Sequence, residues 1–519
     1  MEVPLTPLDL LTRARRLFPD RSGVVEWERN VESDRDVRTS WTYRAFAARC
    51  DRLAWALVRD LGVRPGDRVA WLCGNTHELL EAYYGVLLAG GVLLPLNIRL
   101  APAENRFILH DSGARVLFRH PSQPDPVPPS SVQTIVLGDA LEALLAAQPD
   151  EPFPVPVVDE SSAAELFYTS GSTGTPKGAV LSHRALYLHA IHNALTGGLS
   201  GADVILHTIP LFHVNGWGTA HYVTGLGGVH VLLPRFDASE VLRLVETEAV
   251  TRLFVVPTMM RSILDDPTLG GRDLSSLVQV SIGGAPSGPE LVAEVERRLG
   301  CECICGYGMT VSSPTLTRSL DKPGTPPSVT RRATTGLPIL GVDLRVLADD
   351  GDEVAWDGAS VGEVCARSNH VMTGYWNRPD ETADALRDGW LRTGDLAVVD
   401  AEGYLTIVDR RKDLIVSGGE NIASVEVEKA IAAHPAVREV AVVGVPDDRW
   451  GEVPRAFVSL RPEGDGPPPT EADLIAWVRE RLAHYKAPKS VVFLDELPKG
   501  GTGKVQKQEL RAQAATRSG

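Results

Sequence analysis

Apolar residues recur along the chain with two different periods. Runs such as Leu253–Val256 and Leu277–Ile282 are apolar almost throughout, whereas segments such as His77–Leu88 have the character of a helix. The first pattern predicts strands covered on both faces, and the second predicts helices. Because the two alternate through most of the chain, the sequence predicts an α/β fold with mostly parallel sheets. Further expected strands are Arg68–Cys73, Val92–Leu96, Ala114–Phe118, Thr134–Leu137 and Ala163–Phe167.

The pattern changes after the charged segment Arg410–Asp413. Beyond it, helix-like and strand-like segments alternate over about a hundred residues, the size of one small domain. We therefore expect a large N-terminal domain over residues 1–411 and a small, mobile α+β domain over residues 412–519. The junction holds no Gly/Ser tract, which favours a tight hinge. The expected elements of the small domain are Val425–Ala432, Val437–Gly444, Pro454–Leu460, Glu471–Leu482 and Ser490–Phe493.

Composition narrows the class of protein. The chain has 519 residues, of which 43% are hydrophobic and 23% charged, as in an ordinary globular protein of more than one domain. Its formal net charge of -15 argues against nucleic acid or an anionic membrane as a partner, because both would repel it. The charge does not exclude nucleotides, which local backbone amides and a few cations can bind.

Neither end of the chain resembles a targeting signal. The N-terminus lacks a basic segment followed by an apolar run, and the C-terminal Thr-Arg-Ser-Gly is not a peroxisomal address. The longest apolar stretch, Tyr84–Leu96, is interrupted by glycines and a proline and is too short to span a bilayer. We expect a cytoplasmic protein without a membrane span, either a monomer or a homodimer.

Three of the six cysteines alternate in the segment Cys301-Glu-Cys303-Ile-Cys305. Alternate residues of a strand face the same side, so the spacing invites comparison with a metal site. Zinc sites usually have a fourth ligand and CxxC-type spacing, and the segment has neither. We interpret it as a buried, unreactive strand face.

The segment Phe167–Gly178 has the composition of a loop that binds phosphate. Its glycines let backbone amides converge on anionic oxygens, its hydroxyls add donors, and Lys177 adds a cation. It is not a Walker P-loop, because Lys177 is followed by glycine and not by Ser or Thr. A flexible surface loop would not need the Pro-Lys-Gly ending. The binding residues expected here are Thr169, Ser170, Gly171, Ser172, Thr173, Gly174, Thr175 and Lys177.

This loop resembles the signature of the adenylate-forming superfamily, which includes acyl-CoA synthetases, adenylation domains of nonribosomal peptide synthesis and firefly luciferase. Further segments match in the superfamily's order over nearly the whole chain, so the resemblance is more specific than one loop. The pattern is most similar to that of fatty-acid-type acyl-CoA ligases. The matching segments are Pro210–Trp217, Gly283–Pro286, Gly306–Thr310, Gly389–Asp395, Asp409–Asp413, Ser417–Asn421 and Pro498–Val505.

The resemblance implies a nucleotide site. A purine would lie between backbone and the ring of Tyr307, and Thr310 would bond the α-phosphate. Asp395 would accept both ribose hydroxyls, and Arg410 would reach the ribose or a phosphate. Seen alone, these residues are typical of turns, a core tyrosine and a solvated charge. The nucleotide-binding residues implied outside the loop are Gly284, Ala285, Pro286, Gly306, Tyr307, Gly308, Met309, Thr310, Asp395, Arg410 and Asn421.

The resemblance also implies the catalytic residues, which are Lys504, Thr310 and His213. Lys504, in the Gly-rich loop 500–503, would stabilise charge on the attacking and bridging oxygens while a carboxylate attacks the α-phosphorus and pyrophosphate leaves. Thr310 would hold the α-phosphate during this step. His213 would lie near the carboxylate as a gate, although a lone histidine in an apolar stretch is more often a core residue.

Substrate and hinge roles follow in the same way. Val214 and Trp217, together with His213, would line the acyl site. In a second half-reaction the small domain would pivot at Lys412, withdraw Lys504 and present a thiol tunnel.

One position departs from the superfamily pattern. The residue after Tyr-Gly-x-Thr is usually a glutamate associated with magnesium, and this chain has Val311. A β-branched apolar side chain cannot ligate a metal, so the metal-binding residues stay unknown.

We therefore expect an ATP-dependent, AMP-forming ligase that makes an acyl-adenylate and passes the acyl group to coenzyme A. The implied cofactors and partners are ATP, Mg²⁺, coenzyme A and a small carboxylic acid, with no nucleic acid. One alternative is an amide-forming ligase in which an amine or amino acid captures the adenylate. A minor alternative, suggested by Val311, is a non-catalytic acyl or nucleotide sensor. An α-amino acid as acyl donor is disfavoured, because Val214 and Asn215 stand where amino-acid-activating relatives carry an aspartate.

Overall fold

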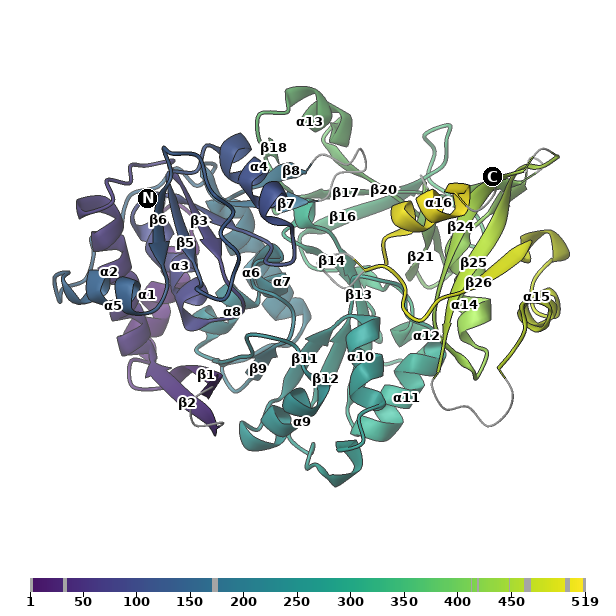
Figure 1. The fold of residues 1–519 in the computed structure, drawn as a ribbon, viewed down its shortest axis with the longest axis horizontal. Helices are drawn as coiled ribbons and strands as arrows, with labels where there is room; N and C mark the ends of the chain where they lie inside the picture. The colour runs from purple at the N-terminus through teal and green to yellow at the C-terminus, as the bar shows by residue number, and fades with distance from the viewer. Residues whose placement is uncertain are drawn as a thin grey trace. The chain divides into compact units, whose positions relative to one another are not determined.

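The computed structural model (Figure 1) describes residues 3–30, 35–169, 176–411, 413–417, 420–447, 449–461, 468–499 and 505–516. The chain divides into two compact units. Unit 1 consists of Met1–Asp343 and Arg367–Leu391, and unit 2 of Leu344–Ala366 and Arg392–Gly519. The boundary between residues 411 and 412 stays a prediction.

A seven-stranded sheet of order β18-β8-β7-β4-β3-β5-β6 lies in unit 1. The strands from β7 to β6 are parallel, and β8 and β18 extend the sheet antiparallel. The parallel strands coincide with apolar runs of the sequence, as expected where both faces are covered. The strands are β3 (Arg68–Leu72), β4 (Val92–Pro95), β5 (Val116–Arg119), β6 (Gln133–Val136), β7 (Ala163–Thr169), β8 (Lys177–Ser182) and β18 (Gly374–Tyr375).

A nine-stranded sheet of order β15-β14-β13-β12-β11-β9-β10-β1-β2 completes unit 1. Its centre, from β13 to β1, is parallel, and the outer strands β14, β15 and β2 are antiparallel. The prediction of mostly parallel sheets is confirmed. The strands are β1 (Ser22–Asn30), β2 (Arg35–Thr42), β9 (Val204–His207), β10 (Val229–Leu232), β11 (Arg252–Val255), β12 (Gln279–Ile282), β13 (Glu302–Gly308), β14 (Thr315–Arg318) and β15 (Leu337–Pro338).

Helices pack against these sheets and against one another, with α2, α3 and α5 beside β3, β5 and β6 (Figure 1). α3 is buried from Glu78 to Leu88, which explains why its sequence is apolar nearly all round. Thr42 and Ser182 begin α2 and α6, where each hydroxyl accepts a backbone N–H of the first turn. The helices are α1 (Leu8–Leu17), α2 (Tyr43–Arg59), α3 (His77–Leu88), α4 (Pro102–Ser112), α5 (Asp139–Ala146), α6 (His183–Thr196), α7 (Val214–Trp217), α8 (Thr219–Leu226), α9 (Ala238–Thr247), α10 (Pro257–Leu264), α11 (Pro289–Leu299), α12 (Val329–Arg332) and α13 (Pro379–Ala385).

The remaining strands form two five-stranded sheets, of order β16-β17-β20-β19 with β21 on β20, and β23-β22-β25-β24 with β26 on β25. The second sheet and its helices form the predicted α+β C-terminal domain. The elements are β16 (Val342–Leu347), β17 (Gly362–Ser368), β19 (Leu386–Arg387), β20 (Trp390–Val399), β21 (Leu405–Arg410), β22 (Ile415–Ser417), β23 (Glu420–Ile422), α14 (Ser424–Ala432), β24 (Val437–Asp447), β25 (Gly451–Leu460), α15 (Glu471–Arg479), β26 (Ser490–Phe493) and α16 (Lys507–Thr516).

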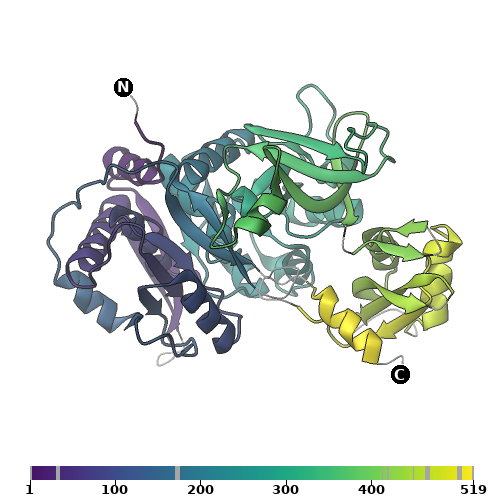
Figure 2. The same cartoon turned by 90° about the horizontal axis from the view of Figure 1, so that it is seen from above.

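Alternation over Val440–Val445 of β24 and over Ala456–Val458 of β25 separates two small cores in unit 2. Val442 and Val458 face a core with α14 and α15, whereas their neighbours Val443 and Phe457 face a core with α16. Figure 2 shows this sheet with its helices in yellow and green. A period of two along both strands is what a sheet covered on both sides requires.

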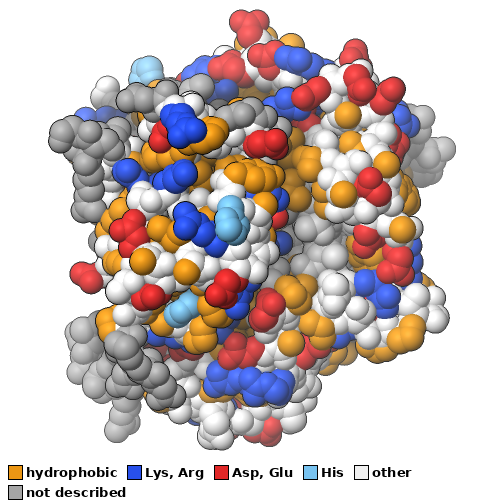
Figure 3. All heavy atoms as spheres, turned by 90° about the vertical axis from the view of Figure 1, so that its right-hand side faces the viewer, with side chains coloured by type: hydrophobic (Ala, Val, Ile, Leu, Met, Phe, Trp, Pro, Cys, Tyr) orange, Lys and Arg blue, Asp and Glu red, His pale blue; other side chains and the backbone are white. Residues whose placement is uncertain are grey.

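Two observations concern membrane crossing and the distribution of charged side chains on the surface. In the part of the chain that the structure describes, no helix combines the length and apolar character needed to cross a membrane. On the face shown in Figure 3, acidic and basic side chains are interspersed among apolar ones.

Candidate functional site

The carboxyl ends of β12 and β13 bring two of the predicted nucleotide segments together. The strands are adjacent and parallel, with Ile282 opposite Cys305, so the segments that begin at Gly283 and Gly306 leave the sheet side by side. A Cβ added to Gly283 would lie 3.4 Å from the carbonyl oxygen of Gly306. Ligands of open α/β sheets bind at such strand ends.

Gly308 must be a glycine in this arrangement. A Cβ at this position would lie 1.9 Å from the carbonyl oxygen of Pro314, where β13 turns back toward β14. Any side chain at this position would therefore force the two backbone segments apart.

Thr310 follows as the first residue of the 3-10 turn Thr310–Ser312 and is 8% exposed. Its neighbour Val311 is buried in the apolar core of unit 1, and the Val311 carbonyl accepts the Met372 N–H at 2.8 Å. The segment 306–312 contains no carboxylate. Oxygen ligands for magnesium there are limited to hydroxyls and backbone carbonyls.

The predicted phosphate loop joins two antiparallel strands, β7 and β8, whose ends pair Thr169 with Lys177. Its residues Ser170, Gly171, Ser172, Thr173, Gly174 and Thr175 lie outside the described residues. The Lys177 ammonium lies 3.9 Å from an oxygen of Glu381 and 5.5 Å from the centre of the Tyr375 ring. The Lys177 side chain is 19% exposed.

The predicted acyl segment forms a left-handed turn. The φ angles are 46° at Val214, 45° at Asn215, 62° at Gly216, 64° at Trp217 and 88° at Gly218. This conformation costs a non-glycine residue about 1–2 kcal/mol, so surrounding contacts must hold it. The short helix α7 is therefore an irregular turn.

The turn exposes two of the three predicted substrate residues. Val214, Asn215, Gly216 and Gly218 are buried, whereas His213 and Trp217 keep some exposed surface. The tip of the Trp217 indole lies 2.9 Å from where a Cβ of Gly283 would be. Trp217 therefore stands at the end of β12, next to the predicted nucleotide segments, while Val214 is a core residue.

In unit 2, antiparallel pairing of β20 and β21 places Asp395 opposite Arg410. The Arg410 guanidinium Nε lies 3.1 Å from an Asp395 carboxylate oxygen. Asp395 follows Gly394, whose φ is 72° and whose N–H donates to Glu363 at 3.1 Å. The predicted ribose-binding pair is thus brought together.

Three predicted site residues of unit 2 lie wholly or partly outside the residues that the structure describes. Lys412 and Lys504 lie outside the described residues, and for Asn421 only the backbone is described, as the partner of Val416. Lys499 and Val505, which flank the glycine loop, form an antiparallel bridge that holds the loop ends together. The roles of Lys412, Asn421 and Lys504 stay predictions.

A group of described residues has the ligand spacing of a metal site. Ligand atoms of Glu26, His77 and Glu78 lie within 4.8 Å of one another. Burial alone would lower the pKa of His77, but hydrogen bonding to Glu26 and the charges of Glu81 and Glu78 raise it to about 9. Glu26 accepts from the backbone N–H of His77 and also pairs with its ring. We interpret the group as an ion-pair cluster.

The cysteine segment at the start of β13 is buried, as predicted. Cys301, Cys303 and Cys305 are at most 8% exposed and carry no disulfide. Burial raises the pKa of the Cys301 thiol to about 12 and also raises that of Cys303. Protonated thiols are poor nucleophiles and poor metal ligands.

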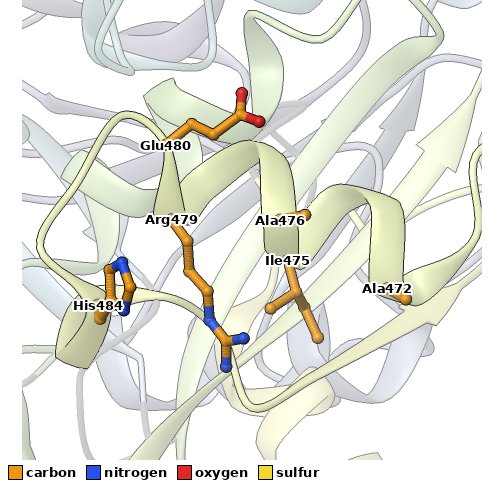
Figure 4. A pocket seen from close by; sticks show the side chains of 6 residues that line it. All are labelled: Ala472, Ile475, Ala476, Arg479, Glu480 and His484. Carbon is orange, nitrogen blue, oxygen red and sulfur yellow. The ribbon is translucent and has the colours of Figure 1, made fainter.

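A shallow hollow in unit 2 lies along α15 (Figure 4) and holds none of the predicted site residues. Figure 4 shows the side chains of Arg479 and Glu480 leaving the helix in opposite directions, so polar groups do not converge there. The lining residues are Ala472, Ile475, Ala476, Arg479, Glu480 and His484.

Three residues that support the acyl turn were not predicted as site residues from the sequence. Glu165 lies in the middle of β7, Asn215 in the turn itself and His221 in α8. The sequence feature that could have indicated this role is the single carboxylate, Glu165, inside the otherwise apolar run Ala163–Phe167.

Comparison with known proteins matches these observations. Residues 12–376 match the family of AMP-binding enzymes, and residues 426–504 match the AMP-binding enzyme C-terminal domain. A feruloyl-CoA synthase from an Amycolatopsis species is 42% identical over 91% of this chain and 94% of its own length. A long-chain-fatty-acid–CoA ligase from Thermus thermophilus is 39% identical over 99% and 96%.

Solved structures agree in fold. The o-succinylbenzoate CoA synthetase from Bacillus subtilis, in complex with an acyl-adenylate intermediate, superimposes with a TM-score of 0.84 and 31% identity. The match covers 99% of this chain and 98% of that structure.

Proposed function

We propose a substrate class for this chain from the premise that it belongs to the AMP-binding enzyme family. It is an AMP-forming acyl-CoA synthetase, which activates a carboxylic acid with ATP and Mg²⁺ through an acyl-adenylate and transfers the acyl group to coenzyme A. The expectation of a ligase that uses a thiol acceptor is confirmed.

The acid that we propose is an aryl or arylalkenyl carboxylic acid. The observation that carries this proposal is the indole of Trp217, which lies partly exposed against Gly283 at the end of β12. A flat acyl group packed on that ring would gain about 0.5–1.5 kcal/mol beyond burial of its area. The 42% identity to a feruloyl-CoA synthase supports the same class.

The contributions of single residues are part of the proposal. The loop from Thr169 to Lys177 binds the triphosphate, with backbone amides and the Lys177 cation as donors. The backbone at Gly284–Pro286 and Gly306–Met309 holds the adenine, and Thr310 bonds the α-phosphate. Asp395, oriented by Arg410, accepts the ribose hydroxyls, as the 3.1 Å contact between the two side chains supports.

The remaining predicted roles belong to the two half-reactions. Lys504 neutralises charge during adenylation, and Asn421 lines the thiol side afterwards. We propose that residues 412–519 reorient about Lys412 between the halves, while residues 1–411 keep the adenylate. His213 shields the carboxylate from water. A cytoplasmic location and a monomeric or homodimeric state are part of the same proposal.

The proposal is tested with acids of matched size. Cinnamic acid and 3-cyclohexylpropanoic acid have similar length and bulk, but only the first is aromatic and planar. We expect kcat/KM for acid-dependent pyrophosphate release to favour cinnamic acid by about two- to tenfold, and Trp217→Leu to remove most of that preference. A higher kcat/KM for octanoic or hexadecanoic acid than for any aryl acid would favour a fatty-acid ligase, the class of the 39% identical relative.

A further inference from the structure

Glu165 is a charged residue at the centre of a buried strand. It lies in β7, is 0% exposed, and pairs in register with Leu93 of β4 and Leu181 of β8. A buried carboxylate is costly unless its oxygens are hydrogen-bonded. Packing alone therefore does not explain a glutamate at this position of an apolar strand.

Both oxygens of Glu165 reach the segment that carries the acyl turn. Oε2 accepts from the Asn215 side-chain amide at 2.8 Å, and Oε1 lies 2.6 Å from Nε2 of His221. His221 is itself 1% exposed and is met edge-on by the rings of Tyr83 and Tyr84. A charged acceptor makes these bonds stronger than neutral ones.

Asn215 passes this restraint to the backbone of the turn. Its side-chain oxygen accepts the N–H of Gly218 at 2.7 Å, across the left-handed residues between them. The hydroxyl of Thr219 closes the turn further by donating to the Gly216 carbonyl at 2.9 Å. These bonds offset the backbone strain of Val214, Asn215 and Trp217.

The conformation of the turn determines where the Trp217 indole lies. Four of the five left-handed residues are buried, and Trp217 is the one that keeps exposed surface and meets Gly283. The direction of its indole is set by backbone angles that few residues adopt unaided. β7 itself ends at Thr169, four residues after Glu165, where the phosphate loop begins.

We propose that Glu165 is a positioning residue for acid activation, which holds the left-handed turn through Asn215 and thereby fixes Trp217 against the acyl group. This inference rests on the proposed acyl-side role of Trp217. Because Glu165 is 0% exposed, it acts on the acid only through the turn, and its removal changes the fit of the acid and not the binding of ATP.

The first test compares Michaelis constants of two variants. Glu165→Gln keeps one acceptor oxygen for Asn215 but loses the charge, and Asn215→Gly keeps the left-handed backbone but loses both side-chain bonds. We expect each to raise KM for the aryl acid at least about tenfold, with KM for ATP changed less than twofold, at temperatures well below unfolding. The selectivity for cinnamic over 3-cyclohexylpropanoic acid should fall in both.

A matched control separates positioning from general destabilisation. Glu81 is another buried carboxylate of unit 1, is 1% exposed and is paired with Arg49 in α2. Glu81→Gln should lower the melting temperature with both Michaelis constants unchanged. The double variant Glu165→Gln/Asn215→Gly should raise KM for the acid no more than the worse single variant, because both act through one network.

The outcomes are distinct. If Glu165→Gln changes KM for acid and ATP equally, or leaves both unchanged, the inference is overturned. If Trp217→Leu alters acid selectivity while Glu165→Gln does not, the proposed substrate class stands and the positioning role falls. If Glu165→Gln raises KM for the acid, and neither Glu165→Gln nor Trp217→Leu changes the selectivity between the two acids, the positioning role stands and the aryl substrate class falls.

Discussion

Val311 is the residue at which this chain departs most clearly from the pattern of its superfamily. Its side chain is 6% exposed and belongs to the main apolar core of unit 1, near Met309 and Met372. A glutamate here would lose its hydration inside an apolar cluster. The neighbourhood of residue 311 is therefore packed around valine.

We predict that Val311→Glu destabilises the protein without improving its response to magnesium. An unpaired carboxylate in this core costs about 1–3 kcal/mol or more, which should lower the melting temperature by several degrees. The concentration of Mg²⁺ needed for half-maximal pyrophosphate exchange should not fall. Val311→Gln, of the same length but neutral, should be destabilised less. A lower magnesium requirement at unchanged stability would show instead that a metal-ligating carboxylate is missing at the position that valine occupies.

Among secondary-structure elements, regular ones could be predicted and the acyl turn could not. β4, β12 and α3 follow from runs and periods that are buried as the sequence indicates. The turn Val214–Gly218 has no periodicity, and its angles depend on Glu165, which is 50 residues away from Asn215. Likewise, the pairing of Asp395 with Arg410 needs the register of β20 and β21, which residue types alone do not specify.

The start of α3 carries an ion-pair cluster that makes stability depend on pH. Glu26 of β1 accepts from both the backbone and the ring of His77, and Glu78, Glu81 and Arg49 complete the charged surroundings. Burial would lower the pKa of His77, but the carboxylates raise it from 6.5 to about 9. A raised pKa means that the folded state holds the proton more tightly than the unfolded one.

We predict that this contribution is complete below pH 6.5 and is lost as the pH rises through about 9. Its upper limit is about 3 kcal/mol. The free energy of unfolding, measured with urea between pH 6 and 9.5, should therefore fall more steeply in the wild-type protein than in His77→Gln. Parallel pH profiles for the two proteins would contradict the assignment of the cluster as the cause.

For the protein as an enzyme, the two-step reaction assigns different work to different parts of the chain. Unit 1 carries Trp217, Thr310 and the loop between Thr169 and Lys177, and unit 2 carries Asp395 and the sequence position of Lys504. In our proposal, adenylation needs Lys504 and thiolysis does not.

Lys504→Ala should therefore separate the two steps. Removing one preorganised cation from a charged transition state typically costs about 10²–10³-fold, so we predict a loss of that size in acid-dependent pyrophosphate exchange. Conversion of a supplied acyl-adenylate to the thioester with coenzyme A should stay within about threefold of wild type. Lys507, paired with Glu428 at 2.7 Å in α14, offers a nearby control lysine whose loss affects stability first. Equal losses in both steps would contradict the proposed division.

The central claim, that an aryl acid is activated as its adenylate, is tested most directly by following oxygen. Cinnamic acid with ¹⁸O in both carboxylate positions is incubated with the enzyme, ATP, Mg²⁺ and coenzyme A, and the nucleotide product is analysed by mass spectrometry. Attack of a carboxylate oxygen on the α-phosphorus leaves one ¹⁸O in each AMP after the thiol displaces it, with unlabelled pyrophosphate and singly labelled thioester. We predict AMP that is two mass units heavier, in a one-to-one ratio with cinnamoyl-CoA. Unlabelled AMP, or ADP with labelled inorganic phosphate, would contradict the account.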